Sequence, residues 1–139
     1  MAQADSTSEP AAGRANGVLV VEDEAILRMM VAEHLRTKGY RVIEAASLNE
    51  AVAVLSSGEP ADIVFSDVNL SGSLGGLSLT VWVREHFPGI PVILTSGNKS
   101  VAERIHAGDP VPFIRKPYDP DEVERSIRSM LSSQSPEQQ

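Results

Sequence analysis

A regular alternation of strand-like and helix-like segments constrains the fold of this chain more than any other feature of the sequence. Short apolar runs, rich in β-branched residues, occur at Val18–Val21, Val42–Ile43, Ile63–Phe65, Val92–Leu94 and Phe113–Ile114. Continuous runs of this kind are typical of strands that are buried on both faces of a sheet. A helical pattern of apolar residues follows each run, so the sequence predicts a βα unit that is repeated five times.

The predicted helices are marked by apolar spacing and by residues that favour helix ends. The first two have apolar positions at Leu27, Met30, Val31 and Leu35, and at Leu48, Ala51, Val52 and Leu55. Gly39 and Gly58 follow these patterns and suit C-terminal caps, while Ser47 and Glu50 match a capping box. Further helical patterns lie at about Leu77–Phe87, at about Lys99–His106 and after Asp119, the predicted N-cap of the last helix.

The alternation also predicts the topology. It implies a parallel sheet with helices on both faces, because right-handed crossovers place the helices there. Two arrangements compete, the flavodoxin-like strand order 2-1-3-4-5 and half of a Rossmann fold. No G-x-G-x-x-G motif follows the first strand, which disfavours the Rossmann arrangement. The predicted fold is therefore a flavodoxin-like (βα)5 domain with a doubly wound, five-stranded parallel sheet.

Composition restricts the classes of function. The formal net charge of -7 argues against direct binding of nucleic acid, and the absence of cysteine excludes disulfides and cysteine-ligated zinc. No apolar run approaches the roughly 20 residues of a membrane span, and the first 17 residues lack the apolar stretch of a signal peptide. We expect a cytoplasmic protein with one domain at residues 17–132 and flexible tails at 1–16 and 133–139.

Polar residues stand at the ends of the predicted strands, where parallel α/β sheets bind their ligands. Glu22 and Asp23 follow the first strand and Asp67 follows the third, which is its neighbour in the predicted order. Clustered carboxylates repel one another and are relieved by a cation, for which an all-oxygen ligand set favours Mg²⁺. Ser96 and Lys116, after the last two strands, suit phosphoryl oxygens. Asp67 is then the better nucleophile for an aspartyl-phosphate, because Glu22 and Asp23 can share the metal.

This arrangement resembles the receiver domain of bacterial two-component response regulators. Four motifs carry the resemblance over about residues 17–131, in the family's order: VLVVEDE, VFSDVNLSG, PVILTSGN and FIRKPYDP. The resemblance implies that Asp67 accepts a phosphoryl group from a histidine kinase or a phosphotransfer protein, with Mg²⁺ as the cofactor.

The resemblance also implies roles around the metal. Asp23 would ligate Mg²⁺ directly, Glu22 would act through water, and Asn69 would contribute its backbone carbonyl beside Asp67. Lys116 would pair with Asp67 and then with the phosphoryl oxygens.

A conformational switch is implied in the same way, as is a cis peptide bond between Lys116 and Pro117. Ser96 would move toward the phosphoryl group and Phe113 would follow it. This movement would change the surface formed by the helix predicted at 99–106, the strand after it and the last helix. The same surface could form a homodimer.

On this hypothesis the chain is a stand-alone signalling module, since only eight polar residues follow Leu131. It catalyses its own phosphorylation and dephosphorylation but is not a turnover enzyme. Its output passes to a downstream protein, or the chain is a phosphate sink, a relay intermediate or an excised piece of a larger protein.

Three functions of other classes compete with this hypothesis. A phosphohydrolase of the haloacid-dehalogenase type would need a second aspartate where Asn69 stands. A flavin carrier would need a phosphate-binding loop after the first strand, where the sequence reads EDEA. A receiver-shaped interaction module that is never phosphorylated is disfavoured by the joint presence of Asp67, Ser96 and Lys116.

Overall fold

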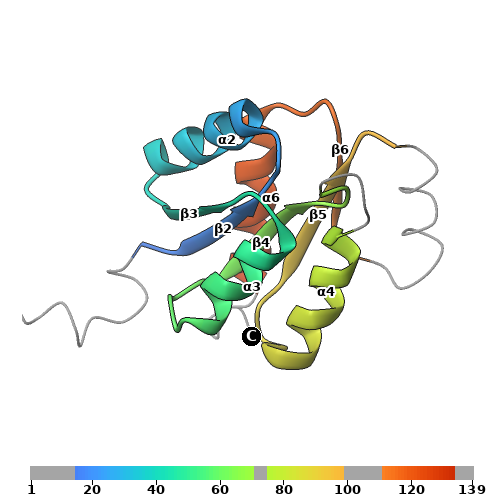
Figure 1. The fold of residues 1–139 in the computed structure, drawn as a ribbon. Coiled ribbons are helices and arrows are strands. Elements are labelled where there is room, and N and C mark those ends of the chain that lie inside the picture. The colour runs from blue at the N-terminus through green and yellow to red at the C-terminus, as the bar shows by residue number, and fades with distance from the viewer. Residues whose placement is uncertain (1–14, 71–74, 99–110, 134–139) are drawn as a thin grey trace, which may run out of the picture.

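A parallel sheet forms the centre of the computed structural model, which describes residues 15–70, 75–98 and 111–133 (Figure 1). Within these ranges the strands are β2 (Gly17–Val21), β3 (Arg41–Ala45), β4 (Ile63–Asp67), β5 (Val92–Ser96) and β6 (Phe113–Arg115). The helices are α2 (Ala25–Thr37), α3 (Leu48–Ser56), α4 (Gly75–His86) and α6 (Pro120–Ser133). The strands lie in the order β3-β2-β4-β5-β6, and all paired strands are parallel. The flavodoxin-like order 2-1-3-4-5 is thus confirmed.

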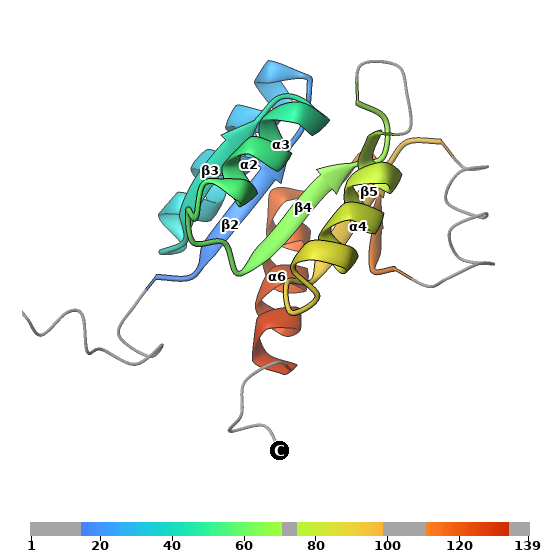
Figure 2. The same ribbon diagram turned by 60° about the horizontal axis from the view of Figure 1, so that its bottom comes forward.

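Helices cover the sheet on both faces (Figures 1 and 2). α2 and α6 pack on one face, where Val20, Leu35 and Ile127 are fully buried. α3 and α4 pack on the other face, where Leu19 and Leu79 are fully buried. Neighbouring residues of β2 point to opposite faces, as the pleat of a strand requires, so each strand contributes to both cores.

The central strands are buried along their whole length, but the edge strands are not. Every residue of β2, β4 and β5 is buried. Four of the five residues of β3 are only half-buried, and β6 ends in the exposed Arg115. The expectation that all five apolar runs are buried on both faces is therefore wrong for β3 and β6. These strands lie at the sheet edges, where one side has no neighbouring strand.

The predicted helix ends are present. Gly39 and Gly58 follow α2 and α3 with φ angles of +96° and +88°, a backbone region that favours glycine. At the start of α3, Ser47 Oγ accepts a hydrogen bond from Glu50 N at 3.1 Å. The Glu50 carboxylate reaches back to Ala46 N at 2.7 Å, one residue before the partner expected in a capping box. Asp119 Oδ1 accepts from Asp121 N at 2.9 Å and caps α6.

The outer side of α2 is more apolar than expected. Met30, which was predicted to lie in the buried stripe, is 53% exposed. Val31 and Leu35 face the core instead, and rotation by about 100° per residue turns Met30 outward. Ile26 and Met29 are also exposed. Within the described ranges, every helix falls short of the length and apolar character that a membrane span requires.

Some predicted segments cannot be compared with the structure. The helix predicted at about Lys99–His106 lies outside the described residues, as do residues 1–14 and 134–139 of the predicted tails.

Candidate functional site

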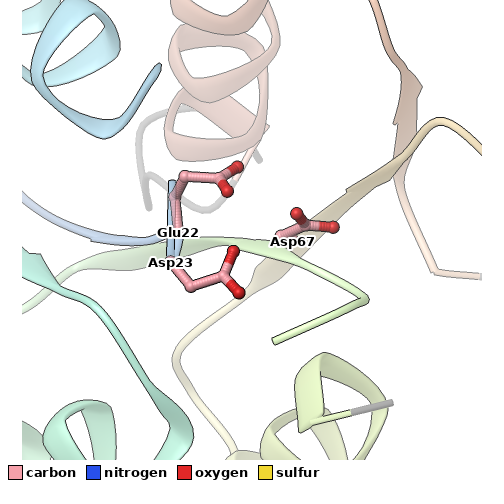
Figure 3. Close-up of side chains that lie close together, drawn as sticks. All are labelled: Glu22, Asp23 and Asp67. Atoms are coloured by element: carbon pink, nitrogen blue, oxygen red, sulfur yellow. The ribbon is translucent and has the colours of Figure 1, made fainter. Parts of the chain in front are cut away.

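Three carboxylates gather at the carboxyl ends of β2 and β4 (Figure 3). Glu22 and Asp23 directly follow β2, and Asp67 is the last residue of β4. Val21 pairs with Ser66 in the parallel ladder, so the next residues, Glu22 and Asp67, reach the same level of the sheet edge. One oxygen from each of the three carboxylates lies within 4.8 Å of the other two. The structure therefore brings together the acidic residues that the sequence placed in one site.

The three carboxylates differ in exposure. Glu22 is 3% exposed and Asp67 is 5% exposed, whereas Asp23 is exposed to solvent. Two neighbouring carboxylates that have lost most of their hydration need a positive partner to stay ionised.

Lys116 supplies that positive charge. Its Nζ donates hydrogen bonds to Asp67 Oδ2 at 2.7 Å and to Glu22 Oε1 at 3.0 Å. Burial alone would lower the pKa of Lys116, but the hydrogen bonds and charges of Asp67 and Glu22 outweigh it and raise the pKa. The ammonium is thus fully charged at neutral pH and is shared by both buried carboxylates.

Backbone N–H groups hold the other oxygens of the same two carboxylates. Asn69 N donates to Asp67 Oδ1, and Glu24 N donates to Glu22 Oε2, each at 3.1 Å. Burial raises the pKa of the Glu22 carboxyl, and the negative charge of Asp67 raises it further. The hydrogen bonds from Glu24 N and Lys116 lower the pKa and offset part of this increase. Every oxygen of Glu22 and Asp67 therefore has a donor, which fixes the orientation of both side chains.

The predicted switch and lysine segments meet at the end of β5. Ser96 is 1% exposed, and its Oγ accepts a hydrogen bond from Asn98 N at 3.0 Å. Lys116 N donates to Ser96 O at 3.0 Å, so the main chain joins the two segments. The peptide bond between Lys116 and Pro117 is cis. Phe113, in β6, is half-buried and packs against the core on the face covered by α3 and α4.

The donor set suits a hard divalent cation. The cluster offers carboxylate oxygens from Glu22, Asp23 and Asp67, with no histidine or cysteine among them. Mg²⁺ prefers such oxygen ligands and is usually held by one or two carboxylates. One oxygen from each of the three carboxylates is close enough to the others for the group to share a single ion.

Comparison with known families agrees with this site. The family model for the response regulator receiver domain matches residues 18–128. The chain belongs to this family. The probable transcriptional regulatory protein TcrX of Mycobacterium tuberculosis is 34% identical to this receiver over 118 residues, which make up 82% of the chain and 49% of TcrX. The receiver thus spans about half the length of TcrX, and roughly a quarter of several other curated relatives.

Solved structures show the same fold. The response regulator receiver protein of Sinorhizobium medicae has a TM-score of 0.77 at 23% identity, covering 87% of this chain and 98% of that protein. The response regulator TrrA of Thermotoga maritima, solved in complex with Mg²⁺ and BeF, has a TM-score of 0.70 at 25% identity. That likeness covers 82% of this chain and 97% of TrrA.

Two residues near the carboxylates were not predicted from the sequence. Tyr118 packs edge-on against Phe65, with ring centroids 5.7 Å apart. Burial raises the pKa of Tyr118, and the charges of Glu22 and Asp67 add to the increase, so its hydroxyl lies within their field. Arg28 donates from Nη1 to Glu22 O at 2.7 Å. The position of Tyr118 two residues after Lys116 was a usable signal, whereas nothing in the sequence paired Arg28 with Glu22.

A cavity of about 460 Å³ opens beside the lysine. Its lining consists of Leu27, Gly97, Lys116, Pro117 and Tyr118. The receiver therefore has an accessible, mostly apolar space next to the ammonium that holds Asp67.

Proposed function

We propose that this receiver accepts a phosphoryl group on Asp67 from a histidine kinase or a phosphotransfer protein, in a reaction that requires Mg²⁺. The observation that carries the proposal is the position of the Asp67 carboxylate. It is 5% exposed and lies between the Lys116 ammonium and the Asn69 N–H, beside two further carboxylates. A carboxylate held in this way is a pre-oriented nucleophile next to groups that can bind a phosphoryl oxygen.

The residues present fit a bound Mg²⁺ ion. Asp23, Asp67 and the backbone carbonyl of Asn69 would hold it, with Glu22 acting through water. When bound, Mg²⁺ neutralises phosphoryl charge and offsets the repulsion between the carboxylates.

The transfer step is a displacement at phosphorus. An oxygen of Asp67 forms a new O–P bond while the N–P bond of the donor phosphohistidine breaks, and the electron pair leaves with the imidazole nitrogen. Lys116 Nζ, which is 2.7 Å from Asp67 Oδ2, is close enough to follow the charge onto a phosphoryl oxygen. The Ser96 hydroxyl is the second group available for such an oxygen. The protein therefore promotes its own modification without being a turnover enzyme.

Phosphorylation would act on a distant surface through Ser96 and Phe113. A phosphoryl group on Asp67 would offer the Ser96 hydroxyl a charged acceptor, and this favours a conformer in which Ser96 moves inward. Phe113 is only half-buried in the edge strand β6, so the core holds it less firmly than it holds the residues of the central strands. The changed surface would include β6 and α6, through which a downstream protein or a second copy could bind.

The exposed apolar residues of α2 are suited to binding the phosphodonor. Ile26 is 67% exposed, and Met29 and Met30 are each 53% exposed. Their i, i+3 and i+4 spacing puts them on one side of α2, which begins two residues after Asp23. A partner that presents a phosphohistidine to Asp67 must cover the surface beside it, and burial of these side chains would stabilise that complex. We also propose that this reaction takes place in the cytoplasm.

The test is intact-mass analysis after incubation with Mg²⁺ and a small phosphodonor. We expect one phosphoryl adduct, which requires Mg²⁺ and is lost in Asp67→Asn. Asp62→Asn is the matched control, because Asp62 precedes the other end of β4 and its carboxylate accepts a hydrogen bond from Gly17 N there. An adduct that persists in Asp67→Asn would contradict the assignment of the acceptor.

A short-lived adduct requires a second measurement. Binding of beryllofluoride with Mg²⁺, followed by NMR or by the fluorescence of Trp82, reports the same site without hydrolysis. If the native protein gives neither an adduct nor a beryllofluoride response, the phosphorylation proposal fails. The chain would then be a receiver-shaped interaction module.

A further inference from the structure

Arg28 joins the acidic segment after β2 to the edge strand β3. Its Nη1 donates to Glu22 O at 2.7 Å and its Nε donates to Glu44 Oε1 at 3.3 Å. The Arg28 side chain is 18% exposed and that of Glu44 is 27% exposed, so water screens these contacts only in part. One guanidinium thus bridges a main-chain carbonyl of the site and a carboxylate of β3.

Glu44 is itself held in place on both oxygens. Arg36 Nη2 donates to Glu44 Oε2 at 3.2 Å and also to Val42 O at 3.1 Å. The carboxylate therefore cannot rotate freely, and it offers Arg28 a fixed acceptor. Arg28 also closes the first turn of α2, since its N donates to Glu24 O at 2.9 Å.

The bridge fixes the peptide that precedes Asp23. The Glu22 carbonyl and the Asp23 N–H belong to one planar unit, so a hydrogen bond to the carbonyl fixes the plane from which the Asp23 side chain departs. On the other side of Glu22, its N donates to Ala45 O of β3 at 3.0 Å. Both backbone polar groups of Glu22 are therefore bonded, one directly to β3 and one through Arg28.

We propose that Arg28 is a positioning residue for the metal site, because its bridge between Glu22 O and Glu44 orients the Glu22–Asp23 peptide and with it the Asp23 carboxylate. This inference rests on the proposed function. The contact of Arg28 with the site is its hydrogen bond to the Glu22 carbonyl, so Arg28 acts through geometry. Groups that orient metal ligands typically contribute about tenfold or more to metal affinity.

The test compares two methionine variants of the 139-residue chain. Arg28→Met removes the donors but keeps most of the apolar stem, and Arg36→Met is the matched control. Arg36 lies on the same helix and bonds the same Glu44 but does not contact Glu22. Calorimetric titration with Mg²⁺ should show affinity about tenfold weaker in Arg28→Met and close to native in Arg36→Met.

A spectroscopic measurement separates positioning from a general loss of stability. In the metal-free protein, the amide ¹⁵N resonance of Asp23 should shift in Arg28→Met and stay near its native position in Arg36→Met. Equal Mg²⁺ affinity in native protein and Arg28→Met, or equal weakening in both variants, would overturn the inference.

Two further outcomes are decisive. If Arg28→Met does not fold, Arg28→Lys is used in its place, since one ammonium cannot reproduce the fork of a guanidinium. An Arg28→Lys variant that binds Mg²⁺ with native affinity would overturn the inference. If the native protein binds no Mg²⁺, the proposed function fails together with this inference. Native binding that Arg28→Met leaves unchanged refutes the inference alone.

Discussion

Lys116 and Glu22 are 94 positions apart in the chain, yet the lysine Nζ lies 3.0 Å from Glu22 Oε1. The same ammonium contacts Asp67 at 2.7 Å, so one cation holds together the ends of β2 and β4. In the proposed reaction Lys116 follows charge onto the phosphoryl group. The contact with Glu22 continues to hold the Lys116 ammonium when it moves onto the phosphoryl group. Glutamate has a longer side chain than aspartate, so it extends further toward the lysine.

Replacement of Lys116 by methionine should destabilise the metal-free protein at neutral pH. Two buried carboxylates would lose their shared donor, and we expect a loss of about 3 kcal/mol in the free energy of unfolding. Urea denaturation in the presence of a chelator measures it. Lys38→Met is the control, because Lys38 is exposed at the end of α2 and should contribute less than about 0.5 kcal/mol. Equal effects of the two substitutions would show that the ion pairs do not stabilise the fold.

Gly76 allows α4 to approach the backbone of the phosphoacceptor strand. A Cβ at this position would contact Asp67 O and lie 2.7 Å from Val68 Cα. Because the obstructing atoms belong to the backbone, they cannot move aside as a side chain could. Gly76→Ala is expected to cost about 3 kcal/mol of stability. Gly89→Ala, where the added Cβ meets nothing within 4 Å, should leave the unfolding midpoint nearly unchanged; the reverse order of effects would contradict this packing argument.

The fold was predictable where burial is complete. Central strands such as β4 read as unbroken apolar runs because both faces and both edges are covered. The errors fall where burial is partial. The predicted strand order places β3 at an edge, but its apolar residues Val42 and Ile43 do not show that it is only half-buried, and Met30 fits the helical stripe although it faces solvent. Which side of a helix or strand is covered depends on the elements that pack against it, and the local spacing of apolar residues does not show where those elements lie.

The site was predictable as far as topology determines it. Parallel strands bring their carboxyl ends to one edge, so the clustering of Glu22, Asp23 and Asp67 followed from strand order. The hydrogen bonds were not predictable in the same way. Whether Lys116 reaches Glu22, and whether Arg28 reaches the carbonyl of Glu22, depends on side-chain length and rotamer across large separations in the chain.

Thr95 carries a buried hydroxyl that lacks a partner within the described part of the chain. It is fully buried in β5, and an unsatisfied hydroxyl costs stability that valine of the same shape avoids. Thr95→Val should therefore raise the free energy of unfolding by about 1 kcal/mol. Thr80→Val is the matched control, since the Thr80 hydroxyl donates to Gly76 O at 2.9 Å and would lose that bond. Thermal melts that show both valine variants losing stability would refute the assignment of an unpaired Thr95.

Tyr40 should make the stability of the protein depend on alkaline pH. Burial, followed by the hydrogen bond to Glu124, raises the pKa of Tyr40 from 10.0 to about 12. Below pH 10 the Tyr40 phenol is protonated in both the folded and the unfolded chain, so it makes its full contribution to the free energy of unfolding. Between pH 10 and about 12 the phenol ionises only in the unfolded chain, so stability falls as the pH rises. Denaturant unfolding of native protein and Tyr40→Phe across this range should show a steeper decline in the native protein. Parallel declines would place the Tyr40 pKa near its ordinary value, as would ultraviolet detection at pH 10 of about half a tyrosinate more in the folded native protein than in folded Tyr40→Phe.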